Sequence, residues 1–195
     1  MNPAVIGIYG ESGSGKTRLI IDIIKRLTRE GFKLACIKIT DKKINVDTKG
    51  KDTWKYAKAG SELVVLSSKN ETDFFVKNKE ELQKIINQIN YLNKYDLVII
   101  EGANDDFTPK IRLGNIKIRK NTIQTYKGDF EELIIKIKNE IIRRKIMKKI
   151  SIKVNGKQIP LTEFPAKFIK NTISGMLKSL KCIDDIKKVE INFEM

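Results

Sequence analysis

The feature that most constrains this chain is the segment from Gly10 to Thr17, which reads Gly-Glu-Ser-Gly-Ser-Gly-Lys-Thr. It matches the G-x-x-x-x-G-K-[ST] pattern of a phosphate-binding loop. Apolar residues 5–9 predict a buried strand before it, and the helical spacing of apolar residues after Lys16 predicts a helix behind it. A strand, this loop and a helix in that order predict a site for a nucleoside triphosphate.

Each residue type in the loop has a chemical reason. Glycines let backbone N–H groups turn toward phosphate oxygens, and the start of the helix adds further unpaired N–H groups. The Lys16 ammonium is expected to bridge the outer phosphates, and the Thr17 hydroxyl is a natural magnesium ligand. The predicted nucleotide contacts of this segment are Gly10, Ser12, Gly13, Ser14, Gly15, Lys16, Thr17 and Arg18.

Strands and helices are predicted to alternate through most of the chain. Such alternation, with short joints, favours right-handed parallel crossovers. It predicts an α/β fold, the doubly wound and mostly parallel sheet of a P-loop NTPase, over residues 1–147. The expected strands after the first are residues 34–39, 63–66, 97–100, 111–118 and 122–126, and the expected helices include residues 54–59, 82–92 and one that Asp129 caps.

The pattern changes near Lys148. Residues 150–159 indicate a hairpin with an Asn-Gly turn at Asn155. A helix with one apolar face and an alternating strand at 188–193 follow, so a small β-β-α-β module of the α+β type is predicted at 148–195. The apolar face is expected to hold Phe164, Phe168, Ile169, Thr172, Ile173, Met176, Leu177 and Leu180.

A carboxylate on the magnesium side is predicted at Glu101. Asp96 and Glu101 flank the apolar residues 97–100, about 16 Å apart at the rise of a strand. Ligands of an open parallel sheet bind at the carboxyl ends of its strands, which favours Glu101. Thr17 and Glu101 are therefore the metal candidates, and Lys16 and Glu101 the candidates for any catalysis.

Residues 93–96 also fit the N-K-x-D pattern that reads guanine in some GTPases. In those proteins the motif follows a strand beyond the magnesium-side acid, whereas here it precedes the strand that ends in Glu101. We therefore do not assign it a base, and the residues alone leave the identity of the base open.

Charge and composition limit the partners. The formal net charge of +15 raises the possibility of nucleic acid, but the densest basic stretch, residues 136–153, lacks aromatics on which bases could stack. We expect no specific nucleic acid. No apolar run reaches the roughly 18 residues of a membrane span, so no membrane partner is expected. Two widely spaced cysteines and the absence of histidine indicate a cytoplasmic protein without a histidine-based site.

The segment Asp47-Thr-Lys-Gly-Lys-Asp52-Thr-Trp-Lys-Tyr-Ala-Lys-Ala-Gly60 resembles the D-x-x-G-K-D-[ST] … A-G segment of the molybdopterin-guanine dinucleotide biosynthesis protein B (MobB) family. The order of landmarks matches as well: the phosphate loop, this segment, Glu101-Gly102, then Pro109-Lys110-Ile111. The resemblance covers residues 3–145. The predicted module at 148–195 resembles an extension of some archaeal members. The segments that carry this likeness are residues 154–160, Val-Asn-Gly-Lys-Gln-Ile-Pro, and residues 172–180, Thr-Ile-Ser-Gly-Met-Leu-Lys-Ser-Leu.

The resemblance implies a GTP-binding, weakly GTP-hydrolysing homodimer that uses Mg²⁺. Such a protein works beside the guanylyltransferase that joins GMP to molybdopterin, in molybdenum or tungsten cofactor synthesis. It also implies that Asp47, Lys51 and Asp52 lie close to the nucleotide. The histidines of the family's K-H-x-H run have no counterpart in residues 38–43, which read Lys-Ile-Thr-Asp-Lys-Lys, so we carry over no role of those imidazoles.

Two other classes remain open. A P-loop small-molecule kinase would use the same loop but needs arginines in a closing lid. Arg112 and Arg119 are the only arginines between Arg29 and Arg143. A nucleic-acid-binding ATPase is the third class.

Overall fold

The computed structural model describes residues 3–42, 44, 47–92, 94–148, 152–155, 157–159, 161, 163–180, 189 and 191. The chain forms two compact units, residues 1–129 and residues 130–195. The boundary between these units, after Asp129, lies earlier in the chain than the predicted domain boundary after residue 147. The reason is that the helix after Asp129 groups with the C-terminal part. The division into functional domains at residue 147 stays a prediction.

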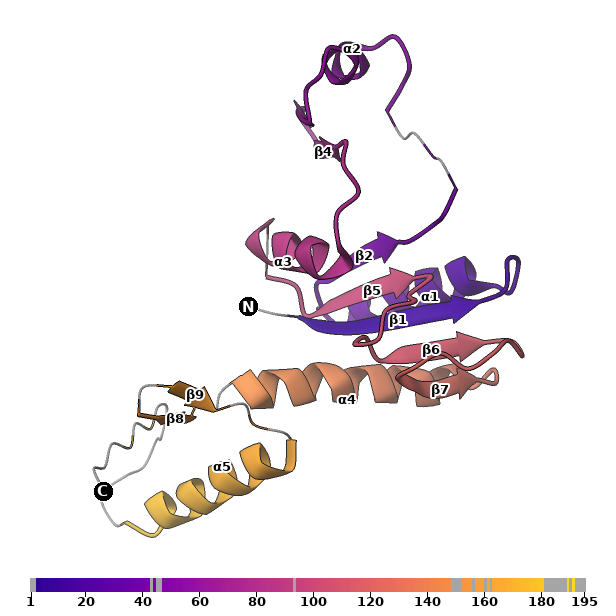
Figure 1. Cartoon of the computed structure of the whole chain (residues 1–195). Helices are drawn as coiled ribbons and strands as arrows, with labels where there is room; N and C mark the ends of the chain where they lie inside the picture. The colour runs from indigo at the N-terminus through magenta and orange to yellow at the C-terminus, as the bar shows by residue number, and fades with distance from the viewer. Residues whose placement is uncertain are drawn as a thin grey trace. The chain divides into compact units, whose positions relative to one another are not determined.

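The first unit is built on a parallel sheet of five strands in the order β2-β5-β1-β6-β7 (Figure 1). All neighbouring strands run parallel, so the predicted α/β class is confirmed. The elements of this unit are β1 (Ala4–Gly10), α1 (Lys16–Arg29), β2 (Leu34–Lys38), α2 (Asp52–Lys58), β3 (Leu63–Ser67), β4 (Thr72–Val76), α3 (Leu82–Leu92), β5 (Leu97–Glu101), β6 (Lys110–Leu113) and β7 (Thr122–Tyr126).

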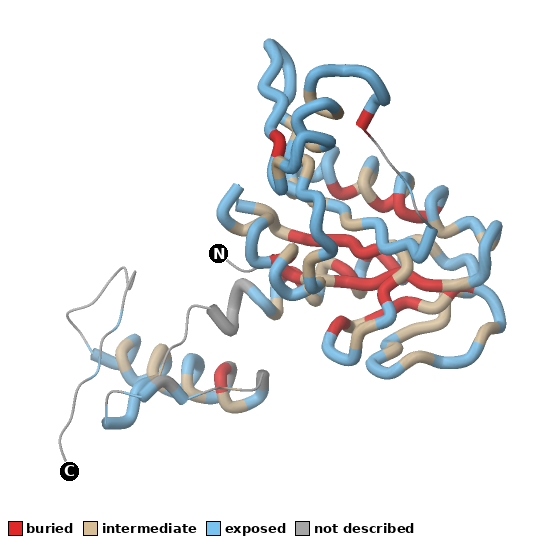
Figure 2. Tube along the Cα trace, turned by 45° about the horizontal axis from the view of Figure 1, so that its top comes forward, coloured by how far each residue is buried: buried red, intermediate tan, exposed pale blue. Residues whose placement is uncertain are grey.

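The centre of the sheet is its most buried part (Figure 2). In β5 all four apolar residues before Glu101 are buried, as expected for a strand covered on both faces. Ile86 of α3 packs with Val98 and Ile100. Successive side chains of a strand alternate between faces, so Ile99 and Glu101 point to the opposite face, where α1 contacts β1 and β5.

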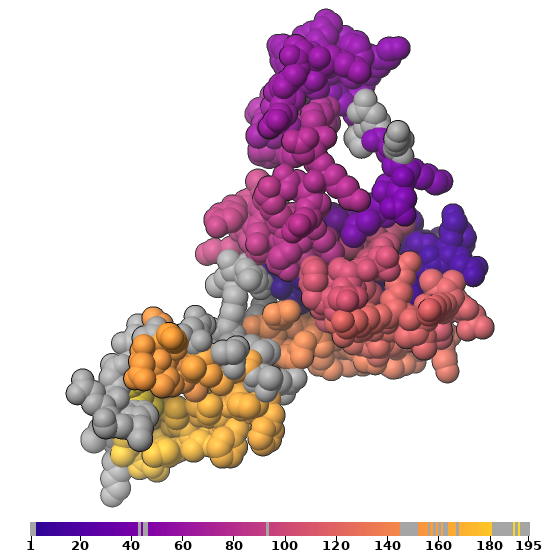
Figure 3. Space-filling view, viewed as in Figure 1, coloured from indigo at the N-terminus to yellow at the C-terminus, as the bar shows by residue number. Residues whose placement is uncertain are grey.

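One predicted strand does not join this sheet. Residues 63–66 were expected as its third strand, but β3 pairs antiparallel with β4, a strand that the sequence did not indicate. Only Val64 of β3 is buried, so this strand lacks the two covered faces of β5. We call residues 47–77 the arm; Figure 1 shows it extending away from the sheet, and Figure 3 shows it as a projection.

A second difference concerns β6. It ends at Leu113, whereas a strand to residue 118 was expected. Gly114 follows with a φ of +74°, and residues 114–121 lead back to the start of β7. The positive φ turns the chain out of the sheet, which the apolar spacing of residues 116 and 118 did not reveal.

The second unit contains α4 (Phe130–Lys148), β8 (Ile152–Val154), β9 (Lys157–Ile159) and α5 (Glu163–Lys178). The predicted inner face of α4, with Leu133, Ile134, Ile137 and Ile141, is buried as expected. β8 and β9 form the predicted antiparallel hairpin, with Asn155 at a φ of +50°. The expected strand at 188–193 lies outside the described residues, apart from Val189 and Ile191.

The predicted apolar face of α5 is wrong in part. Phe164, Phe168, Thr172, Met176 and Leu180 are exposed, and Phe164 stacks on Phe168 with ring centroids 6.2 Å apart. Ala166 is buried, and Ile169, Ile173 and Leu177 are half-buried. At 100° per residue, these four span a narrow stripe, whereas the predicted set spread around more than half of the helix.

Within the described part of the chain, no helix combines the length and apolarity that a bilayer span requires. Cys36 is a free thiol, and Cys182 lies outside the described residues.

Candidate nucleotide-binding site

The phosphate loop connects the end of β1 to the start of α1. Gly15, with a φ of +86°, occupies the position before the first helical residue, Lys16. Left-handed backbone of this kind favours glycine, which explains the pattern at that position. Gly13 has a φ of +78°, and the Ser14 N–H donates to Glu11 O at 3.2 Å. The loop therefore turns tightly onto the amino end of α1, where unpaired N–H groups attract anions.

Side chains of the loop differ in where they lie. The Lys16 ammonium donates to Gly10 O at 3.0 Å and also to Glu11 O, so it lies against the loop. The Ser14 hydroxyl is buried, and Ser12 is exposed. Arg18 pairs with Asp22 at 3.1 Å along the exposed side of α1. Of the predicted nucleotide contacts, Arg18 therefore has a side chain that is paired with a carboxylate of its own helix.

The side chains of Thr17, at the start of α1, and Glu101, at the end of β5, lie next to each other beside the phosphate loop. The Thr17 hydroxyl lies 3.3 Å from each carboxylate oxygen of Glu101. Neighbouring ligands of octahedral magnesium lie about 3 Å apart when metal–oxygen bonds are about 2.1 Å. A hydroxyl and a carboxylate at this separation fit magnesium, with phosphate oxygens and waters as the remaining ligands. No group of three or more metal-ligating His, Cys, Asp or Glu side chains occurs among the described residues, so a protein-only metal cage is absent there.

Asp96 lies at the opposite end of β5, as the strand direction predicts. Its carboxylate accepts the N–H of Lys33 at 2.9 Å, just before β2. Its carbonyl accepts the N–H of Ala4 at 3.0 Å, at the start of β1. Asp96 therefore ties together the amino ends of three strands. Asn93 of the N-K-x-D segment lies outside the described residues.

The three candidates from the G-K-D segment lie in the arm. Asp47 is buried; it accepts the Thr53 hydroxyl at 2.9 Å and lies 3.7 Å from the Lys77 ammonium. Lys51 precedes α2, and Asp52 pairs with Lys55 at 3.0 Å. These contacts organise the arm itself. The proximity of the three residues to a nucleotide stays a prediction.

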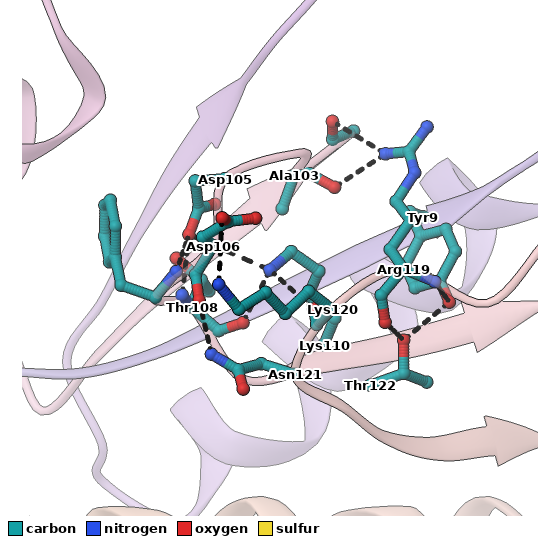
Figure 4. Close-up of polar contacts among 12 residues, drawn as sticks. Tyr9, Ala103, Asp105, Asp106, Thr108, Lys110, Arg119, Lys120, Asn121 and Thr122 are labelled. Atoms are coloured by element: carbon teal, nitrogen blue, oxygen red, sulfur yellow. Dashed lines mark hydrogen bonds and ion pairs between the residues drawn. The ribbon is translucent and has the colours of Figure 1, made fainter.

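A buried ammonium supports the segment that follows Glu101, and sequence reasoning missed it (Figure 4). Lys110, at the start of β6, is fully buried and donates to Thr108 O at 2.8 Å and to Lys120 O at 3.1 Å. Asp105 lies 3.8 Å from this ammonium and accepts the N–H groups of Phe107 and Thr108. Burial opposes ionisation of Asp105, but the Thr108 and Phe107 N–H groups and the Lys110 charge hold its pKa below the usual value.

Arg119 supports the same segment from the loop before β7 (Figure 4). Its guanidinium donates to Ala103 O at 2.6 Å and stands 4.8 Å from the centroid of the Tyr9 ring. The Tyr9 hydroxyl accepts the Arg119 N–H at 3.0 Å and lies 2.6 Å from the Thr122 hydroxyl. For Lys110 the signal available in the sequence was a charged residue at the start of the largely apolar strand Lys-Ile-Arg-Leu, whereas Arg119 lies in a loop and had no such signal.

Comparison with known proteins decides the family. Residues 5–139 match the family model described as "Molybdopterin guanine dinucleotide synthesis protein B", MobB, which is more than half of the chain. The chain belongs to the MobB family. Membership places it among the proteins of molybdopterin-guanine dinucleotide biosynthesis, as the G-K-D segment indicated.

Individual relatives agree with this family. A Methanocaldococcus jannaschii protein, provisionally described as a molybdopterin-guanine dinucleotide biosynthesis adapter protein, is 29% identical over 98% of this chain and 97% of its own length. The Haemophilus influenzae adapter protein is 30% identical over 60% of this chain and 66% of its own length. The archaeal relative therefore also matches the C-terminal part, which lies beyond the family model.

Solved structures of MobB proteins support the fold. The crystal structure of Bacillus subtilis MobB aligns with a TM-score of 0.58 and 19% identity, covering 70% of this chain and 97% of that one. A homologue from Bacillus stearothermophilus aligns with a TM-score of 0.51 and 18% identity, over 73% and 99% of the two chains.

Proposed function

We propose that this chain is a GTP-binding adapter protein that assists the attachment of GMP to molybdopterin. The observation that carries the nucleotide part is the meeting of Thr17 and Glu101, 3.3 Å apart, at the start of α1. A hydroxyl at this position of a phosphate loop and a carboxylate at the end of the adjacent strand are the pair that holds magnesium beside a triphosphate.

Roles follow from where the residues lie. Backbone N–H groups of residues 13–17 would hold phosphate oxygens, and the Lys16 ammonium would exchange its two carbonyl contacts for the outer phosphates. Thr17 and Glu101 would hold the magnesium, which supplies charge neutralisation. Hydrolysis would rest on positioning and electrostatics, without a covalent intermediate. We expect it to be weak.

The cellular setting rests on family membership. A homodimer and a molybdopterin guanylyltransferase partner are proposals from the resemblance, as is a place for Asp47, Lys51 and Asp52 beside the nucleotide. The arm holds these residues in a defined local structure, so the partner or a second copy would meet a preformed surface.

The alternative, a small-molecule kinase, has less support. Arg112 donates to the Thr125 hydroxyl at 3.0 Å and to Ile116 O at 2.9 Å. Arg119 donates to Ala103 O and lies against Tyr9. Both arginines of the central part of the chain are thus engaged within the fold, so neither is free to close over a phosphoryl group.

Isothermal titration calorimetry with GTP and ATP, each with and without Mg²⁺, tests the proposal. GTP should bind in the presence of magnesium, and ATP should bind more weakly. Lys16→Ala should lower GTP affinity about 100-fold, because a charge-assisted contact to phosphate is lost, with circular dichroism unchanged. Wild-type affinity in Lys16→Ala would refute the site, and equal affinity for ATP would refute the choice of base.

A matched pair tests the metal side. Glu101→Gln should weaken magnesium-dependent GTP binding more than magnesium-free binding, because an amide is a poorer ligand for the metal. Asp96→Asn, at the other end of β5, should leave the magnesium dependence unchanged. Equal effects of the two variants on that dependence would contradict the assignment of Glu101.

A further inference from the structure

A second lysine lies beside the Thr17–Glu101 pair without an assigned role. Lys38 is the last residue of β2 and is the register partner of Glu101 in the parallel β2–β5 pair. The next residue, Ile39, donates its N–H to Glu101 O at 2.9 Å. A Cβ atom at Gly102 would lie 2.8 Å from Ile39 O, so only glycine permits this approach. The backbones of Lys38 and Glu101 are therefore held side by side.

The side chains of Lys38 and Glu101 share one face of the sheet. Register partners of neighbouring parallel strands point to the same face, and Glu101 reaches Thr17 at the start of α1. The Lys38 ammonium lies 3.5 Å from Glu101 Oε1. The lysine side chain is 62% exposed and the glutamate side chain 16% exposed. An exposed ammonium thus sits next to a carboxylate that is mostly buried.

The ion pair itself contributes little to stability. Exposed pairs of this kind are worth roughly 0–1 kcal/mol, so separating them costs little. Magnesium held by Thr17 and Glu101 would compete with the ammonium for the same carboxylate. The ammonium would then be next to the oxygens that the metal holds, and in a bound triphosphate these belong to the outer two phosphates.

We propose that Lys38 supplies a second ammonium, besides Lys16, to the terminal phosphate of the bound nucleotide. A magnesium ion held by Thr17 and Glu101 would share this carboxylate and would so weaken the ion pair between Lys38 and Glu101. Lys38 thereby makes the site discriminate a triphosphate from a diphosphate. This inference rests on the proposed nucleotide function and concerns the same site.

Calorimetry with GTP and GDP in the presence of Mg²⁺ tests the inference. Lys38→Gln should lower GTP affinity about 10-fold, the size of one charge-assisted contact, and change GDP affinity less than twofold. Lys38→Arg should retain most of the preference for GTP. Lys42→Gln is the matched control. Lys42 is also exposed and lies four residues from Lys38, and its substitution by Gln removes the same charge. It should leave both affinities near wild type.

The outcomes separate cleanly. The inference is overturned if Lys38→Gln does not weaken GTP more than GDP, or if Lys42→Gln reproduces its effect, because long-range charge would then suffice. Wild-type protein that fails to bind GTP refutes the proposed function itself. Wild-type protein that binds GTP through Lys16, with Lys38→Gln silent, refutes only the role of Lys38.

Discussion

The five-stranded sheet and the arm each bury one charged side chain, but they hold it differently. Lys110, in the sheet, is 0% exposed and has partners on two separate loops, at Thr108, Lys120 and Asp105. Asp47, in the arm, is 8% exposed and is held by Thr53 and by Lys77, whose side chain is 32% exposed. The Lys110 side chain in the sheet is therefore fully shielded from water, whereas in the arm the Lys77 ammonium that pairs with Asp47 is partly exposed to solvent.

The apolar residues of the two regions differ in the same way. Every apolar residue of β5 is buried, whereas Leu63, Val65 and Leu66 of β3 are exposed. The geometry of the candidate nucleotide site, at Thr17 and Glu101, therefore rests on the sheet. The arm has its own local order but little buried apolar surface. We expect substitutions in the sheet to change global stability and equivalent ones in the arm to act locally.

The largest effect should come from Lys110→Met. This change removes two hydrogen bonds and leaves Asp105 without its buried counter-charge, so it should cost about 3–4 kcal/mol in the free energy of unfolding. Urea denaturation followed by circular dichroism measures it. Lys120→Met is the control: Lys120 forms an exposed pair with Asp106 at 3.0 Å and should change stability by less than about 0.5 kcal/mol. Equal effects of the two variants would break the contrast between a buried and an exposed lysine.

A matched pair of valines tests the apolar contrast. Val98→Ala in β5, at 0% exposure, should cost about 2–3 kcal/mol through lost burial and a cavity. Val65→Ala in β3, at 45% exposure, should cost less than about 0.5 kcal/mol. The same denaturation measurement compares them. A large loss of stability in Val65→Ala would show that the exposed face of β3 is covered in solution, and would remove the distinction between the regions.

Asp47→Asn should have a smaller effect, confined to the arm. The amide keeps the shape and can accept the Thr53 hydroxyl, but it loses the attraction of Lys77, at a cost of about 1 kcal/mol. Hydrogen exchange should quicken in α2, β3 and β4 and stay unchanged in β5. Faster exchange in β5 would show that arm and sheet unfold as one unit.

The smallest expected effect is on the dependence of folding stability on pH in acid. The pKa of Asp105 is lowered in the folded chain, although burial opposes this: the N–H groups of Thr108 and Phe107 and the charge of Lys110 favour the carboxylate. Its stabilising contribution is therefore complete above the unfolded pKa and is lost as pH falls through the folded pKa, below about 4. Asp105→Asn should flatten the acid side of the stability profile. An unchanged slope between pH 5 and pH 2 would contradict this role.

Much of the first unit could be predicted because local patterns and their tertiary outcome agree. Residues 5–9 and 97–100 are continuous apolar runs, and both became central strands. Glycine positions marked the loop, and strand direction alone placed Glu101 near Thr17 and Asp96 at the other end. The same reasoning failed for residues 63–66, because a short apolar run does not say which partner it pairs with.

The network behind Glu101 could not be predicted, for a related reason. Arg119 meets Tyr9, and Lys110 meets the carbonyl of Lys120, only because β6 pairs beside β1 and residues 114–121 lead back to the start of β7. A lysine in a basic chain gives no local sign that it is buried. The outer position of Phe164 and Phe168 on α5 likewise depends on which stripe of the helix the fold covers.

By itself, then, the sequence determined the chemistry of the loop, the α/β class and the family, since these depend on residue types at short spacing. Tertiary structure decided which strand paired with which, which charges were buried, and that Lys38 lies beside Glu101. Those outcomes depend on contacts between residues far apart in the chain. Their free energies become available only when the sheet forms, so no local pattern can encode them.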